Sequence, residues 1–93
     1  MKAKLCWAEE AAADLENIAN YLFQNAPERA AELVRGIYNA PAGLLMFPQR
    51  GRGGRKEGTR ELVLSPLPWT VVYRITGECV YVVRILHGAQ KWP

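Results

Sequence analysis

The 93-residue sequence has little of what metal-binding and membrane proteins need. It contains one histidine and two cysteines, with no CxxC pair. Structural zinc sites use four Cys or His ligands, so we expect no metal and no cofactor. No apolar run approaches the roughly 18 residues of a membrane helix, and the N-terminus turns acidic before a long apolar stretch develops. We therefore expect no membrane segment, no secretory signal and a cytoplasmic location.

The two cysteines lie far apart in the sequence. Cys6 and Cys79 both fall in segments that are predicted to be strands. Disulfides are rare in the reducing cytosol, where a free cysteine behaves as a small apolar residue. We interpret both as buried thiols rather than as a disulfide or a metal-binding pair.

Composition indicates one folded domain that spans residues 1–93. Apolar residues make up 49% of the chain and charged residues 23%, as in ordinary globular proteins. The charge is unevenly divided. Residues 1–48 carry four Lys/Arg and six Asp/Glu, a net charge of −2, whereas residues 49–93 carry eight Lys/Arg and three Asp/Glu, a net charge of +5. The basic half suits a nucleic-acid, nucleotide or acidic-protein partner.

Hydrophobic periodicity predicts an α+β fold with the element order β-α-α-β-β-β. We expect a first strand over 2–7, helices over 8–24 and from 27 to about 47, and strands over 59–65, 69–76 and 79–87. Asn25 can cap the second helix, with Glu28 at capping-box distance. Pro41 predicts a kink near Ala40. The short connection makes the helices an antiparallel hairpin packed on one face of a small, mainly antiparallel sheet, with the first strand added at its side.

Strand alternation predicts the faces of the sheet. It places Arg84 with Val80, Val82 and Leu86, and His87 on the opposite face, so that Arg84 and His87 converge only if the strand bulges between them. One face becomes the core and the other is open or covered by a partner.

Three aromatic residues are assigned to packing. Trp69 and Tyr73 lie in the most hydrophobic strand, so we place them in the core rather than against nucleic-acid bases. We expect Trp92 to pack back on Trp7 or on the first helix.

The acidic residues at the start of that helix are interpreted as a capping and solubility feature; they are Glu9, Glu10, Asp14 and Glu16.

The most unusual stretch is residues 48–62, PQRGRGGRKEGTREL, which we call the basic segment. It holds five of the twelve Lys/Arg residues and four of the eight glycines. Glycines let backbone N–H groups approach a ligand, and arginines match phosphate and carboxylate oxygens. The segment is either a mobile loop that contacts an anion or a solvated linker.

Four further stretches follow one another in a recognisable order. They are DLENIANYL, FPQRGR, GTRELVLSPLPWTVVYRI and VVRILHGAQKWP. Over nearly the whole chain, their order and spacing resemble the RelE/ParE superfamily of toxins from bacterial type II toxin–antitoxin modules, the ParE branch in particular. The resemblance implies a microbial-ribonuclease-like fold. It also implies a small acidic antitoxin, ParD-like or RelB-like, whose C-terminal segment wraps the toxin. The toxin would contact operator DNA only indirectly, through this antitoxin.

The two branches of the superfamily differ in target. ParE-like members poison DNA gyrase, and RelE-like members cut messenger RNA on the ribosome. RNA cleavage needs a base, an acid and cations for the phosphorane charge. By resemblance, Arg60 and Arg84 match phosphate-contacting arginines, and His87 could serve as acid or base. RelE-like sites tend to have lysines before the second strand and a C-terminal tyrosine, whereas here there is only Lys56 and a tail without tyrosine.

These departures favour a gyrase inhibitor without catalytic residues. The first alternative is a ribosome-dependent messenger RNA endonuclease that uses Arg60, Arg84 and His87. The second is a basic binding module without toxic activity. In each case the candidate anion- or target-binding residues are Arg50, Arg52, Arg55, Lys56, Arg60 and Arg84. We expect the antitoxin to contact the helical hairpin and the open side of the sheet.

Overall fold

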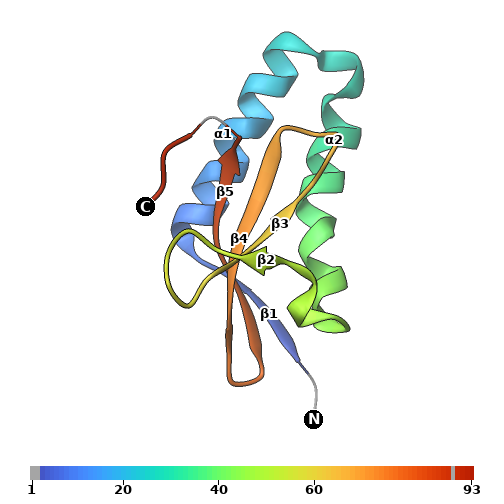
Figure 1. Cartoon of the computed structure of the whole chain (residues 1–93). Helices are drawn as coiled ribbons and strands as arrows, with labels where there is room; N and C mark the ends of the chain where they lie inside the picture. Colours follow the sequence, from blue (N-terminus) through green and yellow to red (C-terminus); the bar gives the residue numbers. More distant parts are fainter. Residues whose placement is uncertain (1–2, 89) are drawn as a thin grey trace.

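Two helices pack on one face of a mixed sheet (Figure 1). The structure is a computed structural model that describes residues 3–88 and 90–93. Its elements are β1 (Lys4–Trp7), α1 (Glu9–Asn25), α2 (Pro27–Asn39), the 3₁₀ helices η1 (Ala40–Leu45) and η2 (Pro48–Arg50), β2 (Arg52–Gly53), β3 (Arg60–Val63), β4 (Trp69–Thr76) and β5 (Cys79–His87). Within these residues the strand order is β1-β5-β4-β3-β2; β1 pairs with β5 in parallel, and the other pairs are antiparallel.

The predicted α+β class and the helical pair on one face of the sheet are confirmed. One strand was not predicted. Arg52 and Gly53, inside the basic segment, form β2 and pair with Glu61 and Arg60 of β3. A two-residue strand has no hydrophobic alternation, and therefore the sequence carries no periodic signal for it. Residue 2, the predicted first residue of β1, lies outside the described residues.

The helical hairpin differs from prediction at its turn and at its end. The N-cap of α2 is Ala26, without a side-chain cap, so the capping by Asn25 was wrong; the Asn25 amide donates to the carbonyl oxygen of Tyr21 at the end of α1. The predicted kink is a change of helix type, since α2 ends at Asn39 and η1 follows. Pro41 has no N–H to donate to an α-helical carbonyl, so the chain tightens into a 3₁₀ turn.

The core lies between the helices and the facing side of β4 and β5. Tyr73, Val71 and Ile37 have no exposed surface, and Trp69 is 7% exposed, so the assignment of Trp69 and Tyr73 to the core is confirmed. Helical residues at the predicted spacing complete the cluster. They are Ala11 and Leu22 from α1, Ala30 and Ile37 from α2, and Leu44 from η1.

A bulge in β5 changes the predicted faces. Tyr73 pairs with Val82 and Val72 pairs with Arg84, which leaves Val83 as an extra residue. Because directly opposite residues share a face, Val82 lies on the helix side and Arg84 on the other side. The predicted grouping of Arg84 with Val80 and Val82 was therefore wrong. The bulge precedes Arg84, so it does not bring Arg84 and His87 together.

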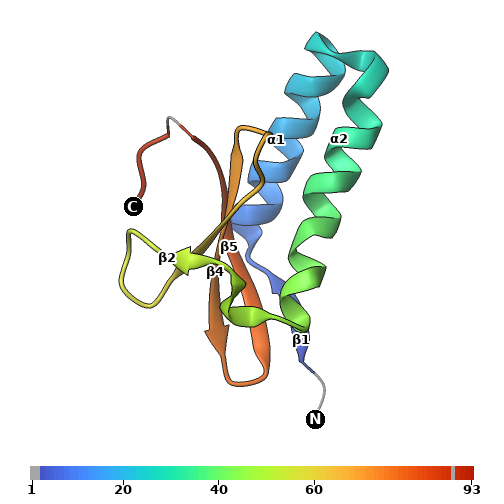
Figure 2. The same ribbon diagram turned by 45° about the vertical axis from the view of Figure 1, so that its right-hand side comes forward.

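The face away from the helices is partly covered by the chain itself. Val72 and Leu86 are fully buried there. Figure 2 shows the helices on one side of the sheet, and the β2–β3 loop and the C-terminal tail on the other side. Loop and tail meet where Arg55 Nη1 donates to the carbonyl oxygen of Gln90 at 3.4 Å. The sheet face that was predicted to be open or covered by a partner is therefore partly covered by the chain itself.

The Tyr73 hydroxyl ties the start of the basic segment to the core. It donates to the carbonyl oxygen of Pro48 at 2.7 Å and accepts from the N–H of Gly51 at 2.8 Å. Tyr73→Phe should lower the free energy of unfolding by about 1–3 kcal/mol, because it leaves the buried Gly51 N–H without a partner. Urea unfolding measures this. The control Tyr81→Phe changes a tyrosine that is 39% exposed, and should stay within about 0.5 kcal/mol of the parent. Equal stability of Tyr73→Phe and the parent would contradict the prediction.

Candidate functional site: an arginine-rich rim

The predicted cations of the basic segment gather at the edge of the sheet formed by β2 and β3. Arg50 ends η2, Arg52 opens β2, and Arg55 and Lys56 lie in the β2–β3 loop. All four side chains are exposed. Together with Arg60 at the start of β3, they form what we call the arginine rim.

Glu61 holds part of this rim in place. Its carboxylate accepts hydrogen bonds from Arg52 Nη2 at 3.2 Å, from the backbone N–H of Arg55 at 3.0 Å and from Arg55 Nε at 3.2 Å. The Glu61 side chain is 1% exposed, whereas those of Arg52 and Arg55 are 67% and 43% exposed. Burial by itself would raise the pKa of Glu61, but the hydrogen bonds from Arg55 and Arg52 and the charge of Arg55 outweigh it and lower that pKa below its ordinary value.

Backbone contacts order the rest of the loop. The N–H of Gly54 donates to the carbonyl oxygen of Thr59 at 2.8 Å, and Thr59 bonds back to the carbonyl oxygen of Lys56 through both its N–H and its hydroxyl. A Cβ on Gly54 would lie 2.8 Å from that Thr59 oxygen, so only glycine fits there. Gly58 has φ +82°, which also favours glycine. The glycines of the basic segment thus shape a hydrogen-bonded hairpin, whereas the sequence analysis left open a mobile loop or a solvated linker.

Arg60 is held at the inner side of the rim. Its Nη2 donates to the carbonyl oxygen of Gln49 at 2.9 Å, while its Nε is buried without a hydrogen-bond partner. Arg60 pairs with Tyr73 across the sheet, so its side chain starts on the helix-facing side.

Arg84 lies apart from the rim and is bound by a carboxylate. Arg84 Nε and Nη2 donate to Asp14 of α1 at 2.7 and 3.0 Å. The N–H of Ile85 also donates to Asp14, at 2.9 Å. The pairing of β1 with β5 ends at Trp7 and Val82, so Asp14 supplies an acceptor at the edge of β5 that β1 leaves open. Asp14 was interpreted as a capping and solubility residue, and this was wrong. Its hydrogen bonds raise the pKa of Arg84 above the ordinary arginine value.

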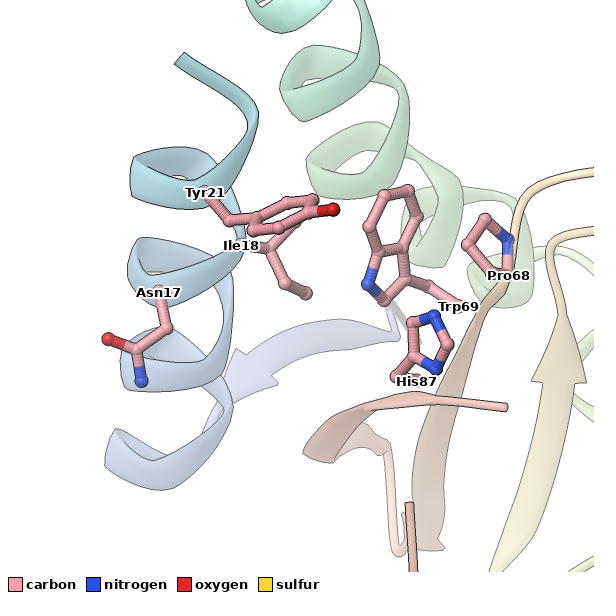
Figure 3. Close-up of a pocket in the computed structure, with 6 residues that line it drawn as sticks. All are labelled: Asn17, Ile18, Tyr21, Pro68, Trp69 and His87. Carbon is pink, nitrogen blue, oxygen red and sulfur yellow. The ribbon is translucent and has the colours of Figure 1, made fainter. Parts of the chain in front are cut away.

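His87 lies at the far end of β5. Its ring meets that of Trp69 edge-on, with the ring centroids 6.4 Å apart. Both rings line a cavity of about 450 Å³ between α1 and the ends of β4 and β5. Figure 3 shows the His87 ring beside Trp69, with Ile18 and Tyr21 of α1 across the cavity.

The residues proposed for RNA cleavage do not converge. His87 pairs with Trp69 and Arg60 with Tyr73, four residues apart on β4, which corresponds to about 13 Å along the strand. Arg84 lies on the opposite face and is bound to Asp14. An acid, a base and a phosphate-binding cation must reach the same phosphate, so these three side chains as placed do not form one catalytic site.

Several contacts were not predicted from the sequence. The carboxylates of Glu61 and Asp14 form ion pairs with three of the six candidate cations, namely Arg52, Arg55 and Arg84, and no local sequence pattern indicates these pairs. The Trp7 ring stacks on Tyr38 of α2, with ring centroids 5.6 Å apart, and not on Trp92 as one of the two predicted positions of Trp92 required. The Trp92 ring lies beside Lys56, with Nζ 6.0 Å from its centroid.

Across residues 3–88 and 90–93, no three His, Cys, Asp or Glu side chains are grouped so that they could hold a metal ion. In the same part of the chain, neither helix has both the length and the apolar character that crossing a bilayer requires.

Comparison with known proteins gives consistent matches along the chain. The family described as "ParE toxin of type II toxin-antitoxin system, parDE" matches residues 5–92. "Putative toxin Y4kP" of Sinorhizobium fredii is 35% identical over 92 residues, which cover 99% of this chain and 95% of that protein. "Toxin RelE2" of Caulobacter vibrioides is 34% identical over 88 residues, covering 95% and 98% respectively. A solved structure described as "Chromosomal ParDE TA system from P. aeruginosa" matches with a TM-score of 0.85 and 28% identity, over 92% of this chain and 96% of that one.

Proposed function

This chain belongs to the ParE toxin family of type II toxin–antitoxin systems, and we propose that it inhibits DNA gyrase without cleaving RNA. The observation that carries the proposal is the separation of Arg60, Arg84 and His87 described above. A ribonuclease that lacks a positioned acid or base loses on the order of 10²–10⁴ in rate. A gyrase inhibitor needs only a binding surface, and the arginine rim offers one.

A second function is kept because of one relative. The 34% identity to "Toxin RelE2" favours RelE-like cleavage of messenger RNA on the ribosome as the alternative. Under that alternative, Arg60 and Arg84 would contact phosphate and His87 would transfer a proton. Arg84 would first have to leave Asp14.

Expression in a bacterial host separates the two functions. We expect growth arrest with filamentous cells and a DNA-damage response, and we expect the purified protein to inhibit supercoiling by gyrase. His87→Ala should leave both effects within about twofold, because the proposal gives His87 no chemical role, and circular dichroism would confirm that this variant folds. Arg50→Glu, which reverses a charge of the rim, should reduce inhibition at least tenfold.

Two results would contradict the gyrase proposal. Mapped cuts in messenger RNA that disappear in His87→Ala would favour the ribonuclease. Normal growth on expression, together with no loss of supercoiling activity, would favour a binding module without toxic activity.

We further propose that an acidic antitoxin covers the helical hairpin next to the arginine rim. The stacked rings of Trp7 and Tyr38 border a hollow of about 450 Å³ that also touches Leu15 of α1. Nearby, Met46 is 79% exposed and Phe47 64% exposed, which leaves an apolar surface beside a basic one. An amphipathic helix with acidic flanks fits such a surface.

The antitoxin encoded beside the gene provides the test. Tyr38→Ala should weaken its binding at least tenfold, measured by calorimetry, because Tyr38 is 57% exposed at the edge of this hollow. The control is Phe23→Ala, a similarly exposed aromatic at the other end of the hairpin, which should change affinity by less than threefold. Binding should also weaken as salt rises, since charges at the rim are screened. If Tyr38→Ala and Phe23→Ala changed the affinity equally, the docking surface would not be centred on Tyr38.

A further inference from the structure

The two cysteines are neighbours in the folded chain. The Cys6 and Cys79 sulfur atoms are 2.7 Å apart, although 73 positions separate the residues in sequence. Parallel pairing of β1 with β5 brings them together, because Lys4 lies opposite Cys79 and Cys6 follows two positions later on the same face. Both residues are partly exposed. Both are free thiols, as predicted, but the prediction that they are buried was wrong.

The pair is open to small molecules. It lines a hollow of about 520 Å³ on the side of the sheet away from the core, together with Glu10 of α1, Arg74 of β4 and Tyr81 of β5. The sulfur–sulfur separation exceeds that of a disulfide bond by only about 0.7 Å.

We propose that Cys6 and Cys79 form a thiol–disulfide site that reacts with low-molecular-weight disulfides and closes a covalent link between β1 and β5. One protein thiolate attacks a sulfur of oxidised glutathione and releases the first molecule of glutathione. The second protein thiolate attacks the protein sulfur of this mixed disulfide and releases the second molecule. The two protein thiols are oxidised, one oxidised glutathione is reduced to two glutathione thiols, and the two protons end on those thiols.

Charged and titratable groups surround the two thiols. The hydrogen bond with Cys6, followed by burial, raises the pKa of the Cys79 thiol, and the nearby charge of Lys4 only partly opposes this. The charged and titratable groups around the pair also include Glu10, Arg74 and Tyr81. Exchange with a disulfide requires a thiolate, so the reaction should be faster at pH 8 than at pH 7. Either cysteine can make the first attack, because either sulfur can donate the hydrogen bond between them.

The link would fix the strand at the edge of the sheet. β1 has four residues and pairs within the sheet only with β5 in the described part of the chain. Its ends are tied by the N–H of Lys4 to the Glu78 carbonyl and by the N–H of Ala8 to the Val82 carbonyl. Joining residues so far apart in sequence restricts the unfolded chain strongly, so the oxidised protein should be the more stable form.

The test treats the full-length reduced protein with oxidised glutathione at pH 8. Intact-mass measurement should show the loss of two hydrogen atoms, with no glutathione attached, and dithiothreitol should reverse it. The melting temperature of the oxidised form should rise by at least about 10 °C. Hydrogen exchange in residues 4–7 should slow in the same sample.

Single substitutions test whether the second thiol resolves the mixed disulfide. Cys79→Ser should hold one glutathione on Cys6 as a stable adduct, and Cys6→Ser should hold one on Cys79. A variant that releases its glutathione as readily as the parent would overturn the role of the second thiol. A parent protein that stays unmodified, retains glutathione or forms linked dimers at low concentration would overturn the site itself. This mass measurement uses the unaltered chain, so it holds whether or not the variants fold, and it does not depend on toxin activity.

Discussion

Replacing Glu61 with alanine is expected to lower the free energy of unfolding by about 3 kcal/mol and to release the β2–β3 loop. The substitution removes three hydrogen-bond acceptor contacts and leaves the backbone N–H of Arg55 without its partner. It also leaves a cavity, because the Glu61 side chain is almost fully buried. Urea unfolding gives the free energy, and hydrogen exchange at residues 52–59 reports the release of the loop.

The matched variant Glu61→Gln keeps the shape and one acceptor oxygen but removes the charge. It should lose about half as much stability as Glu61→Ala. Glu61→Gln and Glu61→Ala would lose the same stability only if the carboxylate charge supplied the whole contribution of Glu61 and its packing supplied none. A Glu61→Ala protein as stable as the parent, with unchanged exchange in the loop, would contradict the anchoring role.

Acidification should act through the same carboxylate. The pKa of Glu61 in the folded protein lies below its ordinary value of 4.5. Its contribution to stability is therefore fully present above about pH 5 and is lost as pH falls through 4.5 toward the folded pKa. Between pH 7 and pH 3, the parent should lose more stability than Glu61→Gln, so the two urea midpoints should approach each other.

Asp14→Ala should produce the second large effect, a loss of about 2–3 kcal/mol. The side chains of Arg84 and Asp14 are 21% and 14% exposed, so removal of the carboxylate leaves a largely buried guanidinium without its ion-pair partner. It also deprives the N–H of Ile85 of its acceptor. Thermal and urea unfolding measure the loss, and exchange of the Ile85 amide should quicken.

Two further variants isolate the ion pair. Glu16→Ala changes an exposed acid of the same helix and should stay within about 0.5 kcal/mol of the parent. In an Arg84→Met background, Asp14→Ala should cost clearly less than in the parent, because no buried charge is left unpaired. A cost that is the same in both backgrounds would show that Asp14 acts only through the Ile85 amide.

These two carboxylates also decide which cations can meet a partner. Glu61 engages Arg52 and Arg55, and Asp14 engages Arg84. Within residues 3–88 and 90–93, Arg50, Lys56 and Arg60 have no ion pair, and Arg60 keeps a buried N–H without an acceptor. An acidic partner at the rim is therefore expected to meet these three first, with Arg52 and Arg55 already oriented by Glu61.

The element order and most of the core were predictable because they depend on neighbours in the sequence. The spacing of Leu22 on α1 and Ile37 on α2 marks helix faces, and the β-branched run that starts at Trp69 marks a buried strand. The capping by Asn25 failed for a local reason, since a helix can begin at any of several adjacent residues of similar free energy. Strand β2 was not predicted because its two residues are too few to show the alternation of a strand.

Sequence alone was enough to establish the helical pair, the strand meander and a basic segment beside them, since each depends on side chains a few positions apart. The pairing of Asp14 with Arg84, of Cys6 with Cys79 and of Tyr73 with the Pro48 turn arose only in the folded chain. These partners are 22 or more residues apart. Because Val83 is an extra residue in β5, side chains that simple alternation would place on one face lie on opposite faces before and after it. Such contacts depend on strand register and on loop closure, which no local pattern encodes.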